Sequence, residues 1–314
     1  MKTNPLVYIV LPCRNWEKYL LEQLMSIYYQ SYKNRFLIFV NDGSTDSSEK
    51  IIRDWNNNYD LNKKVKILSK ENWWLNSAIT IWLEYIKQIC NQNYNNFVCY
   101  CDADDIRIRD KLEKQVSYML ENPKYGLSYH DLFWIDENSR FTKISMISNR
   151  YNKDTSFLYF ASIWNFIAAT SMMFKVSFID KILPMPQWFW MYQDYWTALI
   201  FSFFKINIWY IPVPLGYYRQ GHSSLQSRKV KINQETRNIS QLKYFNFLQE
   251  RFPEKNLDNI IKYKNDRLIN RPNKKYSLFH IYILMLFKYP NIFLIWLKGQ
   301  MRRFFKYWIG IFRN

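Results

Sequence analysis

The amino-acid sequence predicts an α/β fold in which helices flank a mostly parallel sheet. Over about the first hundred residues, short apolar runs alternate with longer segments of helical periodicity, a pattern typical of parallel strands joined by right-handed crossovers. Turn-forming polar clusters follow the second and the fourth of these runs. With 314 residues, 48% of them hydrophobic and 19% aromatic, the chain can bury a sizeable core and does not resemble a disordered one.

Each element of the first half follows from its local pattern. The predicted strands cover residues 7–11, 35–40, 65–68 and 97–101, and the predicted helices between them cover 16–30, 44–55 and 76–90. Asn15 is the candidate N-cap of the first helix, and Ser44, Thr45 and Asp46 are candidates for the second. Ligands of such sheets bind beyond the carboxyl ends of the strands, so the polar clusters at 41–46 and 102–105 are candidate binding residues.

The second half of the sequence is less regular. Its predicted elements are β-structure over 126–136 and 139–145, a helix over 155–165, a strand over 170–174, a helix over 175–183, a strand over 206–212 and a loop over 214–224. Asp194 stands at the entry to a strongly apolar helix. Helices are expected to fill the rest of the chain.

The charge of the chain points to an anionic partner. The net charge is +18, which favours nucleic acid, a phosphorylated ligand or a membrane surface. Residues 274–314 contain eight basic residues and no acidic one, interleaved with aromatic residues. We therefore expect a main domain over 1–225, a helical extension over 226–271, and a basic, aromatic, amphipathic tail over 272–314.

The tail is expected to lie on an anionic membrane surface without crossing the membrane. Its apolar run is long enough to approach a spanning helix, but Lys288 and Pro290 interrupt it at the middle. Aromatic and basic residues in alternation are typical of an interfacial helix. The alternative is a pair of helices that packs on the rest of the protein.

Cysteine and histidine usage argues against two other classes of site. Cys13, Cys90, Cys99 and Cys101 form no CxxC pair, and the chain has three histidines, so we expect neither a zinc site nor a disulfide framework. The N-terminal residues read as a short tail followed by a strand rather than as a secretory signal. The expected compartment is therefore the cytoplasm.

Three carboxylates crowd into four positions at Asp102, Asp104 and Asp105, directly after an apolar run. Carboxylates this close raise one another's pKa unless positive charge lies among them. A solvated helix start would explain Asp residues here, because Asp is favoured in first turns. A divalent cation is the functional explanation, since Mg²⁺ or Mn²⁺ needs only one or two carboxylates in addition to diphosphate oxygens. A turn at the strand end would let Asp102 and Asp104 meet one ligand.

Three further candidates each have a structural and a functional explanation. Asp42 lies in a strand-to-helix turn, where it could simply cap or could accept hydrogen bonds from a nucleoside beside a helix N-terminus. Asp194 is either a helix cap or a general base in apolar surroundings, where the pKa of a carboxylate rises. Arg219 and His222 share one loop, where Arg219 could pair with phosphate and His222 could bind metal or stay solvated.

These motifs together resemble family 2 glycosyltransferases of the GT-A fold. The residues that carry the resemblance are VYIVLPCRNWEKYLLEQLMSIYYQ, FVNDGSTDSSEKII, YCDADDIRIRDKLEKQV, SMMF, QDYWTALIFSFF and IPVPLGYYRQGHSS, within residues 5–225. The order of the last three, SMMF, QDYWTALIFSFF and IPVPLGYYRQGHSS, is similar to that in bacterial rhamnosyltransferase-type members. The chain departs from the family where Gln220-Gly221-His222 replaces the usual Gln-His-Gly, where Gln193 precedes Asp194, and where Trp73 and Trp74 occupy a region usually rich in glycine.

The resemblance implies an activity and a role for each site residue. It makes residues 1–225 the GT-A catalytic domain of a metal-dependent inverting glycosyltransferase with Mg²⁺ or Mn²⁺ as cofactor. Asp194 matches the catalytic base, Asp104 the metal ligand of the DxD motif, and Asp102 its first aspartate. Asp42 matches the nucleoside-contacting aspartate, Pro12 lies near the first nucleotide-contacting turn, and His222 lies near the family's loop histidine. Arg219 completes the expected donor-binding set.

The implied substrates are a nucleotide-sugar donor, with dTDP-rhamnose expected before UDP-hexoses, and a saccharide or lipid-linked oligosaccharide acceptor in cell-surface polysaccharide assembly. The enzyme would then be peripheral on the inner face of the cell membrane. A sugar nucleotidyltransferase is one alternative, but it would need a glycine-rich loop after the first strand, where the sequence LPCRNWEKYL has no glycine. A basic nucleic-acid-binding protein is the other, but acidic clusters would line its binding edge. We expect no nucleic-acid partner.

Overall fold

The structure of the protein is a computed structural model. This structure describes residues 4–59, 64–70, 75–90, 95–143, 155–157, 160, 165–186, 193–220 and 234–269. The chain divides into two compact units, one of residues 1–150 and 165–229 and the other of residues 151–164 and 230–314. The boundaries expected at 225/226 and 271/272 remain predictions.

The first half of unit 1 is a parallel sheet, as the alternating pattern predicts. Its strands are β1 (Val7–Cys13), β2 (Arg35–Asp42), β3 (Val65–Lys70) and β4 (Phe97–Tyr100). They lie in the order β3-β2-β1-β4, and Val10 of β1 is the register partner of Ile38 on one side and Tyr100 on the other. All four point the same way, so the polar residues that follow them gather at one edge.

The second half of unit 1 continues the same sheet with mixed directions. Its strands are β5 (Ile106–Arg107), β6 (Tyr125–Ile135), β7 (Phe141–Lys143), β8 (Met173–Lys175) and β9 (Asn207–Arg219). The order continues β4-β8-β6-β9-β5, with β8 antiparallel to both β4 and β6, and β9 parallel to β6. The sheet therefore runs from β3 to β5 without interruption, and β7 pairs with β6 beside it.

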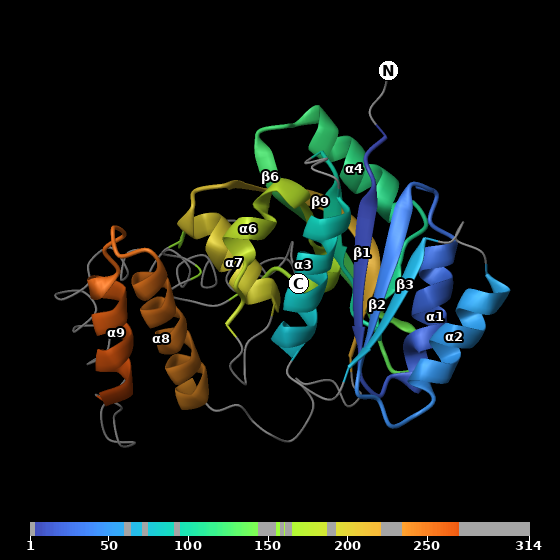
Figure 1. The fold of residues 1–314 in the computed structure, drawn as a ribbon, viewed down its shortest axis with the longest axis horizontal. Coiled ribbons are helices and arrows are strands. Elements are labelled where there is room, and N and C mark those ends of the chain that lie inside the picture. The colour runs from blue at the N-terminus through green and yellow to red at the C-terminus, as the bar shows by residue number, and fades with distance from the viewer. Residues whose placement is uncertain are drawn as a thin grey trace, which may run out of the picture. The chain divides into compact units, whose positions relative to one another are not determined.

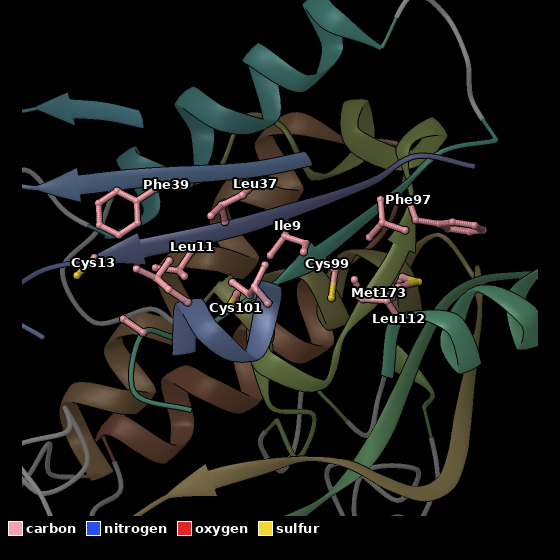
Figure 2. Close-up of a cluster of buried hydrophobic side chains, with 14 of the residues drawn as sticks. Ile9, Leu11, Cys13, Leu37, Phe39, Phe97, Cys99, Cys101, Leu112 and Met173 are labelled. Carbon is pink, nitrogen blue, oxygen red and sulfur yellow. The ribbon is translucent and has the colours of Figure 1, made fainter. Parts of the chain in front are cut away.

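Helices cover both faces of the parallel part. They are α1 (Glu17–Tyr28), α2 (Ser48–Asn58), α3 (Leu75–Ile89) and α4 (Lys111–Glu121). Figure 1 shows α1 and α2 together beside β1 to β3. Residues of β1 alternate between faces, so that Ile9 and Leu11 join a core with Leu24 of α1 and Leu112 of α4. Figure 2 shows this core, where Leu37, Phe39, Phe97 and Met173 also meet.

Short helices connect the remaining strands of unit 1. They are the 3-10 helices η1 (Ala169–Ser171) and η2 (Val176–Phe178) and the α-helices α6 (Ile179–Ile182) and α7 (Gln193–Phe203). The helix predicted over 175–183 is thus shorter than expected and begins as a 3-10 turn. Helix α7 is buried along nearly its whole length, which explains its apolar sequence, and Asp194 lies in its first turn.

Three sequence predictions need correction. The first concerns strand β9, which continues to Arg219, whereas the sequence predicts a loop from residue 214. Strands β6 and β5 pair with β9 on its two sides. A register shift between His130 and Asp131 accommodates the prolines at 212 and 214.

The second correction concerns Asn15, which does not cap its own helix. It adopts a left-handed backbone conformation (φ 58°), and its side chain accepts a hydrogen bond from the Thr45 N–H.

The third correction concerns α2, which begins at Ser48 rather than at Ser44. The Asn41 side chain accepts the Ser44 N–H at 2.9 Å, which makes a turn before the helix. Asp46 then caps both neighbouring helices, because one carboxylate oxygen accepts the Ser48 N–H and the other accepts the Glu17 N–H, each at 3.0 Å. The N-terminal ends of α1 and α2 are therefore joined at the carboxyl ends of β1 and β2.

Unit 2 contains the helical pair α8 (Gln234–Arg251) and α9 (Asp258–Ile269), which pack against each other. The Lys264 ammonium donates to the Gln241 side chain at 2.6 Å inside this unit. Most of the helix predicted over 155–165 and the whole tail over 272–314 lie outside the described residues. Among the residues that are described, no helix combines the length and apolarity that a membrane span requires.

Candidate functional site

The carboxyl edge of the parallel sheet carries the first candidate residues. Pro12 lies near the end of β1, Asp42 is the last residue of β2, and Asp102 follows β4 by two positions. Because β1 lies between β2 and β4, these residues stand at the ends of three neighbouring strands, at one edge of the sheet. Asp42 is buried.

Residues Asp102–Asp105, here called the acidic loop, form a turn immediately after β4. The Asp105 N–H points to the Asp102 carbonyl oxygen at 3.5 Å, and Gln23 of α1 donates to the same oxygen at 2.6 Å. Asp102 and Asp104 are partly exposed residues, whereas Ala103 and Asp105 are buried. The turn thus leaves the two alternate aspartates at the surface of the loop, although the Asp102 carboxyl group itself is largely removed from water.

Asp102 and Asp194 lie beside consecutive residues of η1. The Thr170 amide is near the Asp102 carboxylate, and the Ala169 amide and the Asn165 side chain are near the Asp194 carboxylate, where each favours the charged form. The Asp194 carboxylate also accepts the Tyr195 N–H. The Tyr195 bond measures 2.7 Å. One turn of 3-10 helix therefore brings together two carboxylates that lie far apart in the sequence.

The environment raises the pKa of both carboxyl groups. Removal from water is the largest cause for Asp102, followed by the negative charges of Asp104 and Asp194, and together they raise its pKa to about 8. Removal from water also raises the pKa of Asp194 to about 7, against the hydrogen bonds that stabilise its charge. A general base with a pKa near neutrality is suited to proton transfer at physiological pH.

Two more groups complete the cluster. Asp105 is buried, and removal from water followed by the charges of Asp104 and Asp102 raises its pKa well above its usual value. One of its oxygens accepts the Arg219 N–H at 3.0 Å, and the other has no hydrogen-bond partner within the described residues. Burial, and then the charge of Asp105, raises the pKa of the Tyr218 phenol. Tyr218 therefore lies beside the acidic loop, at the end of β9.

Arg219 lies at the acidic loop, but its guanidinium binds protein oxygens. Its Nε donates to the Asp104 carbonyl oxygen at 2.8 Å, and its side chain has no exposed surface. The role of Arg219 as a phosphate ligand stays a prediction. His222 and the paired tryptophans Trp73 and Trp74 lie outside the described residues, so the structure says nothing about metal binding by His222.

The donor set of the acidic loop fits a divalent cation. No group of three or more Asp, Glu, His or Cys side chains converges as a metal cage within the part of the chain that the structure describes. Mg²⁺ and Mn²⁺ do not require one, because one or two carboxylates suffice when diphosphate oxygens complete the coordination. The partly exposed Asp102 and Asp104 would supply those carboxylates, and the raised pKa of Asp102 indicates that added positive charge would be favourable here.

The sequence did not point to several residues that build the site. The amides of Ala169 and Thr170 lie beside the two carboxylates and favour their charged forms, yet backbone groups leave no residue-type signal in a sequence. Asn165 had no recognisable motif around it. Tyr218 precedes Arg219 in the stretch IPVPLGYYRQGHSS. Its position next to a predicted donor-binding residue is a sequence signal by which it could have been included among the candidates.

Solved structures share the architecture of this protein. Residues 1–349 of TarS from S. aureus, determined with UDP-GlcNAc, superimpose with a TM-score of 0.58 at 16% identity, covering 88% of this chain and 77% of that one. The mannosyltransferase PcManGT from Pyrobaculum calidifontis, determined with GDP-Man and Mn²⁺, gives a TM-score of 0.55 at 14% identity, covering 96% and 85%. At these identities the comparison establishes the fold, which is that of the GT-A glycosyltransferases.

The sequence comparison then gives the family. The profile of glycosyl transferase family 2 matches residues 8–182, which include β1 to β4, the acidic loop and η1. The chain belongs to glycosyl transferase family 2.

Two relatives show how far the similarity extends. An uncharacterized glycosyltransferase of Haemophilus influenzae is 39% identical over 119 residues, which are 38% of this chain and 44% of that protein. An uncharacterized glycosyltransferase of Rickettsia prowazekii is 26% identical over 240 residues, which are 74% of this chain and 70% of that protein. The chain thus matches less than half of the Haemophilus relative and about two thirds of the Rickettsia one.

Proposed function

We propose that the protein transfers a sugar from a nucleoside diphosphate donor to a hydroxyl group of a saccharide or lipid-linked oligosaccharide, with inversion at the anomeric carbon. The observation that carries this proposal is the proximity of Asp102 and Asp194, which lie beside consecutive residues of η1 and close enough for the charge of Asp194 to raise the pKa of Asp102. A donor-side carboxylate and a carboxyl group of pKa about 7 are thereby held next to each other. Family membership supports the reaction class.

In this mechanism Asp194 accepts the proton of the acceptor hydroxyl as its oxygen forms a bond to the anomeric carbon. The hydroxyl attacks from the face opposite the leaving nucleoside diphosphate, so a single displacement inverts the configuration. Asp42 and Pro12 line the seat of the nucleoside, and Asp102 and Asp104 orient the diphosphate. A divalent cation held by Asp104 and Asp102 would neutralise charge on the leaving diphosphate.

The donor is proposed to be a dTDP-deoxyhexose such as dTDP-rhamnose, with UDP-hexoses second. TarS has been solved with UDP-GlcNAc and PcManGT with GDP-Man and Mn²⁺, so uridine and guanosine donors belong in the same screen. The acceptor is proposed to belong to cell-surface polysaccharide assembly. Residues 272–314, which lie outside the described residues, are proposed to hold the enzyme on the inner face of the membrane near a lipid-linked acceptor.

A binding screen tests the proposal directly. The thermal midpoint of the full chain is measured with dTDP, UDP and GDP, each with Mn²⁺ or with EDTA. We expect one nucleotide to raise the midpoint in the presence of Mn²⁺ and to lose this effect with EDTA, because a ligand that binds only the folded state stabilises it. No stabilisation by any of the three would contradict the proposal. Release of pyrophosphate instead of nucleoside diphosphate on turnover would indicate nucleotidyl transfer.

A further inference from the structure

The end of β9 is bound to the acidic loop through both the backbone and the side chain of Arg219. The Arg219 N–H donates to the Asp105 carboxylate at 3.0 Å, and its Nε donates to the Asp104 carbonyl oxygen at 2.8 Å. These two bonds hold consecutive residues of the loop from one side. They are long-range contacts, since more than a hundred residues separate Arg219 from the loop.

The other end of the guanidinium binds two further segments. Its Nη1 donates to the Asp136 carbonyl oxygen at 3.1 Å and to the Ser139 hydroxyl oxygen at 2.8 Å, both in the turn between β6 and β7. Its Nη2 donates to the Glu22 carboxylate of α1 at 2.6 Å. The Ser139 hydroxyl in turn donates to the same Glu22 oxygen at 2.9 Å. Arg219, Glu22 and Ser139 therefore form a closed triangle of hydrogen bonds.

Ser139 has a left-handed backbone conformation (φ 62°), which is uncommon for a residue other than glycine. Its own N–H donates to the Asp136 carbonyl oxygen at 3.2 Å, so the turn closes locally as well as through Arg219. The triangle thus joins a tight turn, a helix and the acidic loop around the Arg219 guanidinium. Several elements therefore hold this side chain in place at once.

The guanidinium has no room for a phosphate in this arrangement. The Arg219 side chain has no exposed surface, and four of its five N–H groups point to protein oxygens. The aromatic ring of Tyr19 lies 4.3 Å from its central carbon. Glu22 provides the carboxylate that pairs with this buried charge, and its own side chain is 41% exposed.

We propose that Arg219 and Glu22 are positioning residues, which hold the acidic loop in the form that binds the donor diphosphate and its cation. The proposal rests on the proposed function, because it assigns that role to the loop. Glu22 acts through Arg219, and Arg219 acts through the backbone of Asp104 and the carboxylate of Asp105. Neither side chain touches the substrate.

The test compares Glu22→Ala and Arg219→Lys with the control Glu121→Ala. Glu121 is an exposed helical glutamate that accepts the Ser117 hydroxyl at 2.8 Å, so the control removes the same group from a similar setting away from the loop. Lysine keeps the charge of Arg219 but cannot reproduce a planar fork that reaches four oxygens. Because the Glu22 side chain is 41% exposed, Glu22→Ala is expected to fold even if a change at Arg219 is not tolerated.

The first measurement is hydrogen–deuterium exchange of the ligand-free protein, which needs no knowledge of the donor. We expect faster exchange over residues 102–107 and 136–140 in Glu22→Ala and Arg219→Lys, unchanged exchange over α2, and no change in the control. Unchanged exchange over 102–107 in both variants would overturn the proposal.

The second measurement is the affinity for dTDP and for UDP in the presence of Mn²⁺, by calorimetry. We expect both variants to bind about tenfold more weakly than the wild type and the control, the loss that follows removal of a hydrogen bond to a charged group. Arg219→Lys could bind the nucleotide more weakly while Glu22→Ala binds it as tightly as the wild type or more tightly. That result would show that Arg219 contacts the phosphate, and it would overturn the proposal. If the wild type binds neither nucleotide, the proposed function fails, and the exchange rates alone decide the positioning role.

Discussion

The hydroxyl groups of Tyr100 and Thr197 lie 3.1 Å apart and share a hydrogen bond in the protein interior. Tyr100 ends β4, two residues before Asp102, and Thr197 lies in α7, three residues after Asp194. The bond therefore joins the strand that leads into the acidic loop to the helix that carries the proposed base. Both side chains are fully buried, so neither hydroxyl has water as an alternative partner.

We expect Tyr100→Phe to lower the free energy of unfolding by about 1 kcal/mol, because it leaves the Thr197 hydroxyl without this bond. We also expect turnover to fall several-fold, since the two carboxylates lose one of the contacts that fix their spacing. Urea unfolding and initial rates measure the two effects. Thr197→Ser keeps the hydroxyl and serves as the control. Turnover that is lost in both variants alike would show that packing, not the hydrogen bond, matters here.

Asp104→Ala should abolish the cation-dependent part of donor binding while the protein stays folded. Asp104 is partly exposed in a turn, so its removal leaves no large cavity, but it removes the proposed metal ligand. Calorimetry with the nucleoside diphosphate, with Mn²⁺ and with EDTA, measures the effect. Asp54→Ala, which removes an exposed carboxylate paired with Lys50 in α2, is the control. Equal affinity in wild type and Asp104→Ala, both insensitive to EDTA, would contradict the metal assignment.

Asp194→Asn should reduce turnover by about 10² to 10⁴, the usual contribution of a general base, and leave donor affinity unchanged. Asparagine keeps the size of the side chain but cannot accept the proton. The wild-type rate should rise with pH, because only the charged form is a base and its pKa is about 7. A bound cation nearby would move this midpoint downward.

A mutant that keeps most of its turnover would assign the base to another residue. Asp131 is another buried carboxylate, but it lies within β6 and accepts the Leu132 N–H at 2.8 Å and the Tyr210 hydroxyl at 3.3 Å. A rate that is independent of pH from 5 to 9 in the wild type would argue against any carboxyl base of this kind.

The strand ends were predictable, because hydrophobic alternation and turn residues are local signals, and the candidate aspartates were chosen from their places at these ends. The strands predicted at 7–11, 35–40, 65–68 and 97–101 are β1 to β4, each extended or shortened by a residue or two. The reach of β9 was not predictable, since Pro212 and Pro214 suggest a loop and are tolerated only because a register shift accommodates them.

Contacts between distant segments explain the rest of what the sequence did not reveal. Glu22 and Arg219 are separated by 197 positions, and neither belongs to a pattern that connects them. The same holds for η1, whose Ala169 and Thr170 lie beside Asp194 and Asp102 in a fold where the following strand, β8, pairs with β4. Tertiary pairing, not local propensity, assembles the charged part of the site.

Stability should depend on pH through Asp102 when no cation is present. Its pKa is about 8 in the folded protein and 3.8 in an unperturbed chain, so between these values the folded state binds more protons than the unfolded state. The free energy of unfolding should therefore fall as pH rises from about 4 to about 8, and Mn²⁺ should oppose the fall.

Below pH 6.5, His130 makes the free energy of unfolding rise with pH, because burial lowers its pKa well below the usual value. The difference between wild type and Asp102→Asn, measured by urea unfolding with EDTA, isolates the Asp102 contribution. A difference that does not change with pH would contradict it.

The tail over residues 272–314 should bind anionic liposomes reversibly. Residues 274–314 contain eight basic residues and no acidic residue. Each basic residue near an anionic surface contributes about 1 kcal/mol to binding. Lys288 and Pro290 would be costly at the centre of a bilayer, so an interfacial position is favoured over a spanning one.

The measurement is flotation of the full chain and of a chain truncated after Arg271, with anionic and with neutral liposomes. We expect only the full chain to float, only with anionic liposomes, and to be released by high salt because the attraction is screened. Equal behaviour of the two chains would favour a tail that packs on the protein, and resistance to salt and alkali would favour a spanning segment.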